Sequence, residues 1–294
     1  MGMTGLADQR FRLNDGRVLG FAEYGDPVGR PVFYCHGFPA SRLEGRIIDT
    51  AAKRHRARII AADRPGYGRS HFQSGRRLTD WPDDLWQLAD GLGIERFAVL
   101  GISGGGPYAL ACAWKHGERV IAVSVVCGLG PVYQEWAVRA MRWPARLGFR
   151  LDRHQHWLLN LVYGGLVARI LRWRPELIRA LLTVGAPETD RAVLARPDIS
   201  RCVLDASREA LRQGPRAVLQ DFVLYANAWG FPFQQIARPV DIWQGGADAT
   251  VPPSHAQFLA EALPQALLRL LPEEGHFSLP INFIDDILCA LFGA

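Results

Sequence analysis

Residues 97–109 read F-A-V-L-G-I-S-G-G-G-P-Y-A. The short apolar run at its start predicts a buried strand over Phe97–Gly101, and the residues that follow predict a helix over Gly104–His116. Ser103 then lies at a sharp strand-to-helix turn inside the pattern G-x-S-x-G, the setting that exposes a serine hydroxyl as a nucleophile. Each glycine inside a helix costs about 1 kcal/mol relative to alanine. Close backbone packing at such a turn would account for three in a row.

Apolar strands alternate with helices on both sides of this turn. We expect a hairpin of Phe11–Leu13 and Val18–Tyr24 around the turn residues at 14–16, which read N-D-G. Because continuous apolar strands separated by helices are typical of parallel sheets, the pattern predicts an α/β fold whose mostly parallel sheet is flanked by helices. Further strands are expected at Pro31–Cys35, Ala57–Ala62, Val120–Val126, Pro239–Gln244 and 267–271, and further helices at Ser41–His55, 81–92, 253–262 and 279–292.

The strand pattern stops near Gly128 and returns only at Pro239. We therefore expect an α/β core made of residues 1–130 and 236–294, interrupted by an all-helical cap, or lid, made of residues 131–235. Long insertions into sheet folds are frequently functional. Within the insertion, helix starts are indicated at Pro131, Asp152, Pro175, Pro187, Asp198 and Pro215.

A serine nucleophile needs a base to take its proton and an acid to orient that base. Asp248 follows a strand directly, at the carboxyl end where functional loops of parallel sheets lie, whereas the rival Asp241 is near the start of that strand. His276 follows the next strand, whereas His255 falls at a helix start. We predict Ser103 as nucleophile, Asp248 as the orienting acid and His276 as the general base.

The negative oxygen that forms when serine attacks a carbonyl needs two backbone donors. One is expected to be the N–H of Gly104, at the start of a helix whose dipole adds positive charge. The second is expected to be the N–H of Phe38, in the stretch C-H-G-F-P at 35–39. We expect His36 of that stretch to be structural, holding the loop through a hydrogen bond.

Together these residues resemble the α/β-hydrolase superfamily, and in particular its esterase- and lipase-like serine hydrolases. H-G-F-P at 36–39, D-R-P-G-Y-G-R-S at 63–70, G-I-S-G-G at 101–105, G-x-x-D-x-x-V-P at 245–252 and G-H-F at 275–277 occur in the order of that family. The resemblance covers nearly the whole chain. It implies an eight-stranded sheet, a cap after the sixth strand, a structural role for the loop at 63–70, and no cofactor.

The residues predict a serine hydrolase that cleaves a small to medium carboxylic ester through an acyl-enzyme. Ser103 argues against epoxide hydrolases and haloalkane dehalogenases, which are similar but place aspartate at the turn. Carbon–carbon-bond hydrolysis, peptide hydrolysis, cofactor-free peroxidase-type activity and a non-catalytic hydrolase-like receptor remain alternatives. A dinucleotide-binding oxidoreductase also fits Gly104-x-Gly106-x-x-Ala109, but it needs an acidic residue about 20 positions later. Residues 119–134 contain no Asp or Glu.

The net charge of +5 has an uneven distribution over the 294 residues. Residues 131–235 contain 15 arginines and nine acidic residues, so the positive charge lies on the proposed lid. We expect either amphipathic helices with solvated arginines, or an apolar acyl pocket under a cationic rim that favours anionic substrates or an anionic lipid surface. Five of the nine tryptophans are in the same insertion, namely Trp136, Trp143, Trp157, Trp173 and Trp229.

Composition also bounds the environment and partners. The five cysteines are odd in number and lack C-x-x-C spacing, which favours free thiols over a disulfide framework or a zinc site, and no metal is expected. No stretch resembles a signal peptide or reaches the ~20 apolar residues of a membrane span. We expect a cytoplasmic protein that acts on a small-molecule ester or acyl substrate, without nucleic acid and without stable membrane insertion. The oligomeric state is not predicted.

Overall fold

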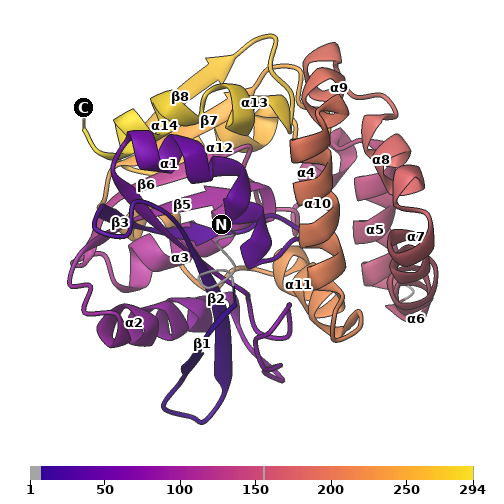
Figure 1. Ribbon diagram of the computed structural model, residues 1–294. Coiled ribbons are helices and arrows are strands. Elements are labelled where there is room, and N and C mark those ends of the chain that lie inside the picture. The colour runs from indigo at the N-terminus through magenta and orange to yellow at the C-terminus, as the bar shows by residue number, and fades with distance from the viewer. Residues whose placement is uncertain (1–7, 155, 294) are drawn as a thin grey trace.

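One sheet forms the centre of the fold, with its eight strands in the order β1-β2-β4-β3-β5-β6-β7-β8 (Figure 1). The computed structural model describes residues 8–154 and 156–293. Strand β2 is antiparallel to β1 and β4, and the remaining neighbours are parallel. The predicted α/β fold with a mostly parallel sheet is therefore confirmed. The strands are β1 (Gln9–Arg12), β2 (Val18–Gly25), β3 (Arg30–Cys35), β4 (Ala57–Ala62), β5 (Phe97–Ile102), β6 (Val120–Val126), β7 (Val240–Gly245) and β8 (Ala266–Leu271).

Helices cover both faces of the sheet, and each face has its own apolar core. Successive side chains of a strand point to opposite faces. Phe33 accordingly belongs to the apolar cluster that includes residues of α2, α3 and α12, whereas its neighbour Tyr34 belongs to the cluster that includes residues of α1 and α14. The first three helices are α2 (Trp81–Gly91), α3 (Gly106–Lys115) and α12 (Pro253–Ala262), and the other two are α1 (Asp49–Arg54) and α14 (Ile284–Leu291).

Between β6 and β7 the described chain forms helices and turns without a strand. We call residues 131–235 the insertion. Helices α5–α8 lie at the right-hand edge of Figure 1, beyond α4, α10 and α11, which are nearer the sheet. No helix of the described chain is long and apolar enough to cross a bilayer. The insertion helices are α4 (Glu135–Ala140), α5 (Trp143–His154), α6 (His156–Asn160), the π-helix η4 (Leu161–Val167), α7 (Ala168–Trp173), α8 (Pro175–Thr183), α9 (Glu188–Ala195), α10 (Pro197–Ala210), α11 (Arg216–Ala226) and the short 3₁₀-helix η5 (Phe233–Gln235).

Several helix boundaries differ from the sequence expectations. The helix expected over 41–55 is a 3₁₀-helix, η1 (Arg42–Ile48), followed by α1. Gly45 of η1 packs so closely on Tyr24 of β2 that an added Cβ would lie 2.9 Å from the ring. The helix starts expected at Pro131 and Asp152 are not found. Helix α4 begins at Glu135, and position 152 lies within α5. The single helix expected over 279–292 is divided into two helices, α13 (Ser278–Asn282) and α14.

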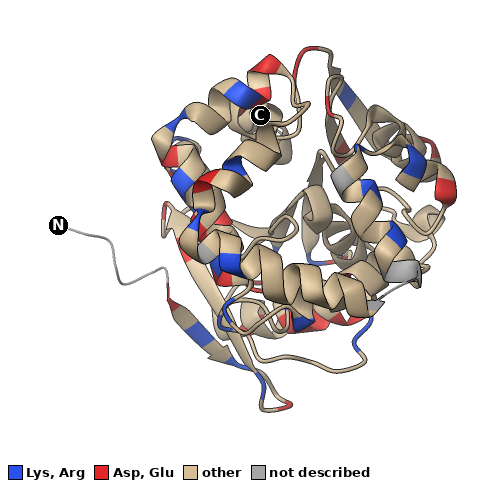
Figure 2. Cartoon of the chain, turned by 90° about the vertical axis from the view of Figure 1, so that its right-hand side faces the viewer, with Lys and Arg blue, Asp and Glu red and all other residues tan. Residues whose placement is uncertain are grey.

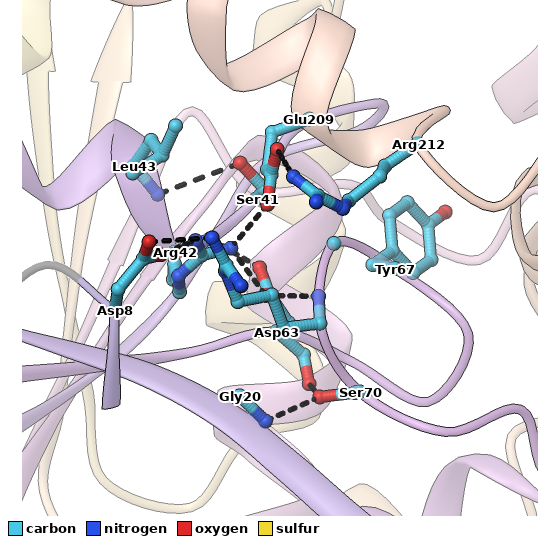
Figure 3. A network of polar contacts seen from close by, with 12 residues as sticks. Asp8, Gly20, Ser41, Arg42, Leu43, Asp63, Tyr67, Ser70, Glu209 and Arg212 are labelled. Carbon is cyan, nitrogen blue, oxygen red and sulfur yellow. Dashed lines mark hydrogen bonds and ion pairs between the residues drawn. The ribbon is translucent and has the colours of Figure 1, made fainter. Parts of the chain in front are cut away.

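The loop at 63–70 is a buried polar scaffold, drawn in Figure 3. The carboxylate of Asp63 accepts hydrogen bonds from the backbone N–H (2.7 Å) and guanidinium (2.8 Å) of Arg42, and Ser70 Oγ donates to the Asp63 carbonyl (2.6 Å). The same guanidinium pairs with Glu209 of α10 at 2.8 Å. Breaking a buried ion pair by removing one partner costs about 3–5 kcal/mol. This cluster therefore fastens the insertion to the core.

Candidate active site

Ser103 stands at a sharp turn between β5 and the helical segment that begins with η3 (Ser103–Gly105). Its φ of +54° lies in the left-handed region, which is unfavourable for residues other than glycine. The neighbouring glycines allow the turn. A Cβ added to Gly105 would lie 2.0 Å from the carbonyl oxygen of Cys35, and one added to Gly101 would lie 2.6 Å from that of Gly105. The backbone packing expected from the glycine run is therefore present.

The structure places His276 between Ser103 and Asp248, at the carboxyl edge of the sheet. His276 Nε2 is 3.0 Å from Ser103 Oγ, and His276 Nδ1 is 2.7 Å from Asp248 Oδ2. The other carboxylate oxygen of Asp248 accepts the backbone N–H groups of Thr250 and Val251, both at 2.8 Å. The three side chains singled out from the sequence thus form one continuous hydrogen-bonded chain, which we call the candidate triad.

The two rival residues are engaged elsewhere. Asp241 pairs with Arg269 of β8 at 3.4 Å, near the amino end of its strand. His255 accepts the backbone N–H of Gly130 at 2.9 Å, and its other ring nitrogen is 3.0 Å from the carbonyl oxygen of Ala137. This histidine joins α12 to the start of the insertion, which is a structural task.

The environment of His276 favours its protonated form. Burial acts to lower the pKa of His276, but the negative charge of Asp248 and the hydrogen bond to it outweigh burial, so the pKa lies above its ordinary value. When neutral, the ring donates from Nδ1 to Asp248 and presents the lone pair of Nε2 to Ser103. This is the arrangement that a general base requires.

The two predicted oxyanion donors lie side by side. A Cβ added to Gly104 would be 2.6 Å from the Cβ of Phe38, so the two backbone segments are in direct contact. The N–H of Phe38 donates no hydrogen bond to any residue that the structure describes. Gly104 belongs to the first helical turn after Ser103, where N–H groups lack acceptors within the helix. Both segments can therefore supply free donors beside the serine.

The loop at 35–39, which we call the Phe38 loop, is held in place by hydrogen bonds from Arg64 of the loop at 63–70. The guanidinium donates to the carbonyl oxygens of His36 (2.5 Å) and Gly37 (3.0 Å), and the backbone N–H of Arg64 donates to His36 Nε2 (3.3 Å). Burial, and then the charge of Arg64, hold the pKa of His36 well below its ordinary value. His36 is fully buried and neutral, so it orders the loop rather than taking part in chemistry.

Glu44 holds the same loop from the other side, and sequence reasoning missed it. Its Oε2 accepts the backbone N–H of Gly37 at 2.6 Å and the hydroxyl of Tyr34 at 3.1 Å. Burial raises the pKa of Glu44 despite these donors. The backbone next to Phe38 is thus fixed by a carboxylate on one side and a guanidinium on the other.

Two carboxylates of the insertion also reach the site, and no motif marked them. Asp190 of α9 binds the backbone of the His276 loop. Asp221 of α11 is fully buried, and although burial opposes it, the charges of two arginines hold the pKa of Asp221 below its ordinary value. One turn further along α11, Tyr225 donates its hydroxyl to the carbonyl oxygen of Gly104 at 2.8 Å. The hydrogen-bond donors to Asp221 include Arg64 (2.9 Å), Tyr67 (2.8 Å), Tyr108 (2.6 Å) and Arg76.

A cavity of about 310 Å³ opens beside Ser103, between the core and the insertion. Its described lining residues include the ionisable side chains of Glu44, Arg142 and His276. Burial lowers the pKa of Arg142, whose guanidinium donates to three carbonyls at the end of α8 and has no described carboxylate within 4.0 Å. The apolar lining side chains include Phe38, Ile47, Ile48, Ile102, Val167, Leu171, Ile178, Leu181, Leu182, Val203, Phe277 and Ile281.

One group of side chains has a spacing that could bind a metal ion. Ligand atoms of Cys127, Asp248 and His276 lie within 4.8 Å of one another. Burial raises the pKa of the Cys127 thiol well above its ordinary value, and the protonated thiol is a poor ligand. Asp248 and His276 already bind each other. These residues fit proton transfer better than metal coordination.

Comparisons with known proteins place the chain in a family. The sequence profile of the alpha/beta hydrolase fold matches residues 30–283. Proline iminopeptidase of Xylella fastidiosa (strain Temecula1 / ATCC 700964) is 27% identical over 302 residues, which cover 95% of this chain and 93% of the relative. The chain therefore belongs to the α/β-hydrolase fold family, as its motifs suggested.

Solved structures show the same fold. An esterase from Exiguobacterium antarcticum has a TM-score of 0.70 at 17% identity, covering 97% of this chain and 98% of that one. A bromoperoxidase from Bacillus anthracis has a TM-score of 0.73 at 18% identity, covering 98% and 100%. At these identities the likeness concerns the fold, and differently named hydrolases and a peroxidase share it.

Proposed function

We propose that the protein is a serine hydrolase that cleaves a small to medium carboxylic ester through an acyl-enzyme. The observation that carries this proposal is the hydrogen-bonded chain from Ser103 through His276 to Asp248, which opens onto an apolar cavity. An activated serine beside free backbone donors is the arrangement that acyl transfer requires.

The geometry supports a two-stage reaction. His276 Nε2 takes the proton of Ser103 Oγ as that oxygen attacks the ester carbonyl, and Asp248 stabilises the resulting imidazolium. The carbonyl oxygen becomes negative and accepts hydrogen bonds from the N–H groups of Phe38 and Gly104. The imidazolium then protonates the leaving alcohol, and an acyl-serine remains. In the second stage a water molecule attacks this ester with the same base, which releases the acid.

The cavity supports an apolar acyl group of moderate size. Its volume of about 310 Å³ is near the lower end of the range for small-molecule sites, ~300–1,000 Å³. A hydrocarbon chain bound against these walls contributes about 25 cal/mol for each Å² of apolar surface buried.

The nearest alternatives use the same nucleophile on another bond. A peptidase activity is suggested by the name of the Xylella relative, a proline iminopeptidase, and a carbon–carbon-bond hydrolase would employ the same triad. A non-catalytic receptor of this fold would bind a ligand in the cavity without turnover. These alternatives differ in the bond that they cleave, so the substrate decides among them.

A panel of substrates tests the proposal. It consists of p-nitrophenyl esters of graded acyl length, a vinylogous diketone and a prolyl amide, each assayed with the native chain and with Ser103→Ala. We expect kcat/KM to be highest for an ester of intermediate length, and Ser103→Ala to remove turnover. Faster cleavage of the amide or the diketone, or absence of ester turnover, would contradict ester hydrolysis.

A further inference from the structure

Large apolar side chains are exposed on one side of the insertion. Of the 14 exposed large hydrophobic residues in the described chain, nine belong to residues 143–184. Trp143, Trp157 and Trp173 are 56%, 68% and 68% exposed. Single exposed apolar residues are ordinary, but such a concentration marks an interaction site. We call these nine residues the apolar side of the insertion: Trp143, Leu147, Trp157, Leu161, Leu166, Trp173, Leu177, Leu181 and Val184.

The helices that carry most of these residues, with η4 (Leu161–Val167) among them, lie at one edge of the molecule. Helices α5, α6, α7 and α8 lie together in Figure 1, on the side away from the sheet. Figure 2 looks onto this side, where the helices carry blue bands of Lys and Arg, together with red bands of Asp and Glu on the helices at the left of the view. A partner that covers this side can therefore reach it without moving the core.

The same segment is strongly basic. Residues 142–184 contain eight arginines and two acidic residues. Arg150, Arg169 and Arg179 are exposed, and no carboxylate of a described residue lies within 4.0 Å of their guanidinium groups. Positive charges on the helices that carry the apolar side are therefore available to a partner.

We propose that the apolar side of the insertion docks on an anionic lipid surface. Tryptophan and leucine side chains enter the boundary between headgroups and acyl chains, while arginines beside them bind lipid phosphates. Charge complementarity selects this partner. A second copy of the chain, docking through the same side, would bring two sets of arginines together and be repelled.

Docking would place the cavity next to the membrane. Leu181 is exposed on the apolar side and also lines the cavity, and Ala145 and Ile178 line the cavity from the same two helices, α5 and α8. If the proposed esterase function holds, an acyl ester dissolved in the bilayer reaches Ser103 from this side. The docking itself does not depend on that function.

Sedimentation with lipid vesicles tests the proposal on the full chain. We expect the protein to sediment with vesicles of phosphatidylcholine that contain phosphatidylglycerol, and much less with phosphatidylcholine alone. Binding should weaken as added salt shortens the Debye length from ~30 to ~8 Å. Quenching of tryptophan fluorescence by brominated lipids should accompany binding, since Trp143 and Trp157 enter the lipid.

Two variants separate the apolar and charged contributions. We expect Trp143→Ser with Trp157→Ser to reduce binding at least tenfold and to lower the quenching by the lipid, with Trp173 left as the exposed tryptophan of this side. Each basic side chain near an anionic surface strengthens binding by a factor of about five. Arg150→Gln, Arg169→Gln and Arg179→Gln together should therefore weaken binding by at least tenfold as well.

Matched controls make the outcome decisive. Val28→Ser with Leu267→Ser alters side chains that are 83% and 52% exposed elsewhere and should leave vesicle binding unchanged. Ser103→Ala should bind as the native chain does, so a failure of the esterase proposal would not affect this assay. Equal binding to both kinds of vesicle, absence of binding, or a dimer in light scattering that the tryptophan variant dissociates would overturn the proposal.

Discussion

Asp190 of helix α9 accepts a hydrogen bond from the backbone N–H of His276 at 3.0 Å. Its other carboxylate oxygen accepts the N–H groups of the next two residues, Phe277 (2.9 Å) and Ser278 (2.8 Å). The contact is so close that a Cβ added to Gly275 would lie 2.4 Å from the carboxyl carbon. A buried acid of the insertion thus fixes the backbone that carries the candidate general base.

Replacing Asp190 should affect stability and turnover together. In Asp190→Ala three N–H groups lose their acceptor, and each unsatisfied buried group costs about 1–3 kcal/mol. We expect a loss of a few kcal/mol in the free energy of unfolding and at least a tenfold fall in kcat, with a smaller change in KM. Urea unfolding and ester hydrolysis measure the two effects. Asp198→Ala, an exposed acid on the neighbouring helix α10, should change neither, and an unaltered kcat in Asp190→Ala would refute the positioning role.

We expect the buried carboxylate of Asp221, through its ion pair with Arg64, to hold in place the loop at 35–39 that carries the N–H of Phe38. Asp221→Asn leaves the buried charge of Arg64 without its anion, which is expected to cost about 3–5 kcal/mol of stability. Tyr225→Phe is the milder test, because it removes only the hydroxyl that donates to the Gly104 carbonyl. We expect Tyr225→Phe to remain folded and to lower kcat several-fold with little change in KM. Native kcat in this variant would show that the hydroxyl does not position the donor.

The pH dependence should report the pairing of His276 with Asp248. Only the neutral imidazole accepts a proton, so activity should rise as the pH passes through the pKa of His276. Because Asp248 raises that pKa, the rise should lie above the ordinary value of ~6.5. In Asp248→Asn the negative charge that opposes the effect of burial on the pKa of His276 is lost. The rise of activity should therefore move to lower pH, while kcat falls by ~10²–10⁴.

Asp241→Asn is the matched control for the choice of acid. This residue pairs with Arg269, and its loss should leave the pH profile in place. An inactive Asp241→Asn beside an active Asp248→Asn would reverse the assignment.

Arg142 should favour substrates that carry a negative charge remote from the ester. A hydrogen bond to a charged group contributes about 1.5–3 kcal/mol, so Arg142→Gln should lower kcat/KM for a carboxylate-bearing ester at least tenfold relative to a neutral isostere. Arg142→Lys should retain part of the preference. For the native chain, kcat/KM of the anionic ester should fall with salt while that of the neutral ester does not. Equal salt dependence for the two esters would remove the electrostatic preference.

The fold could be predicted from the sequence, and the three residues of the candidate triad could be singled out, because the sequence signals for both are local. Glycines around Ser103 are required by backbone contacts, and the positions of Asp248 and His276 follow from the strands that precede them. Asp190 and Asp221 could not be found in this way. An acidic residue on an amphipathic helix normally faces solvent, and only tertiary packing shows that these two are buried against the core.

Several predicted helix boundaries were wrong for the same reason, because they depend on tertiary packing. Gly45 of η1 packs against Tyr24 of β2, a tertiary contact that the periodicity of the sequence does not encode. The cavity is also a product of packing, since its walls come from the core and from helices of the insertion.

Covalent labelling tests whether Ser103 is an activated nucleophile. A fluorophosphonate probe should attach one group per chain, and digestion should locate it on the peptide that contains Ser103. Ser103→Ala should abolish labelling while the melting temperature stays near the native value, because the hydroxyl contributes little to packing. Labelling that persists in Ser103→Ala, or that maps to another serine, would show that Ser103 is not the nucleophile.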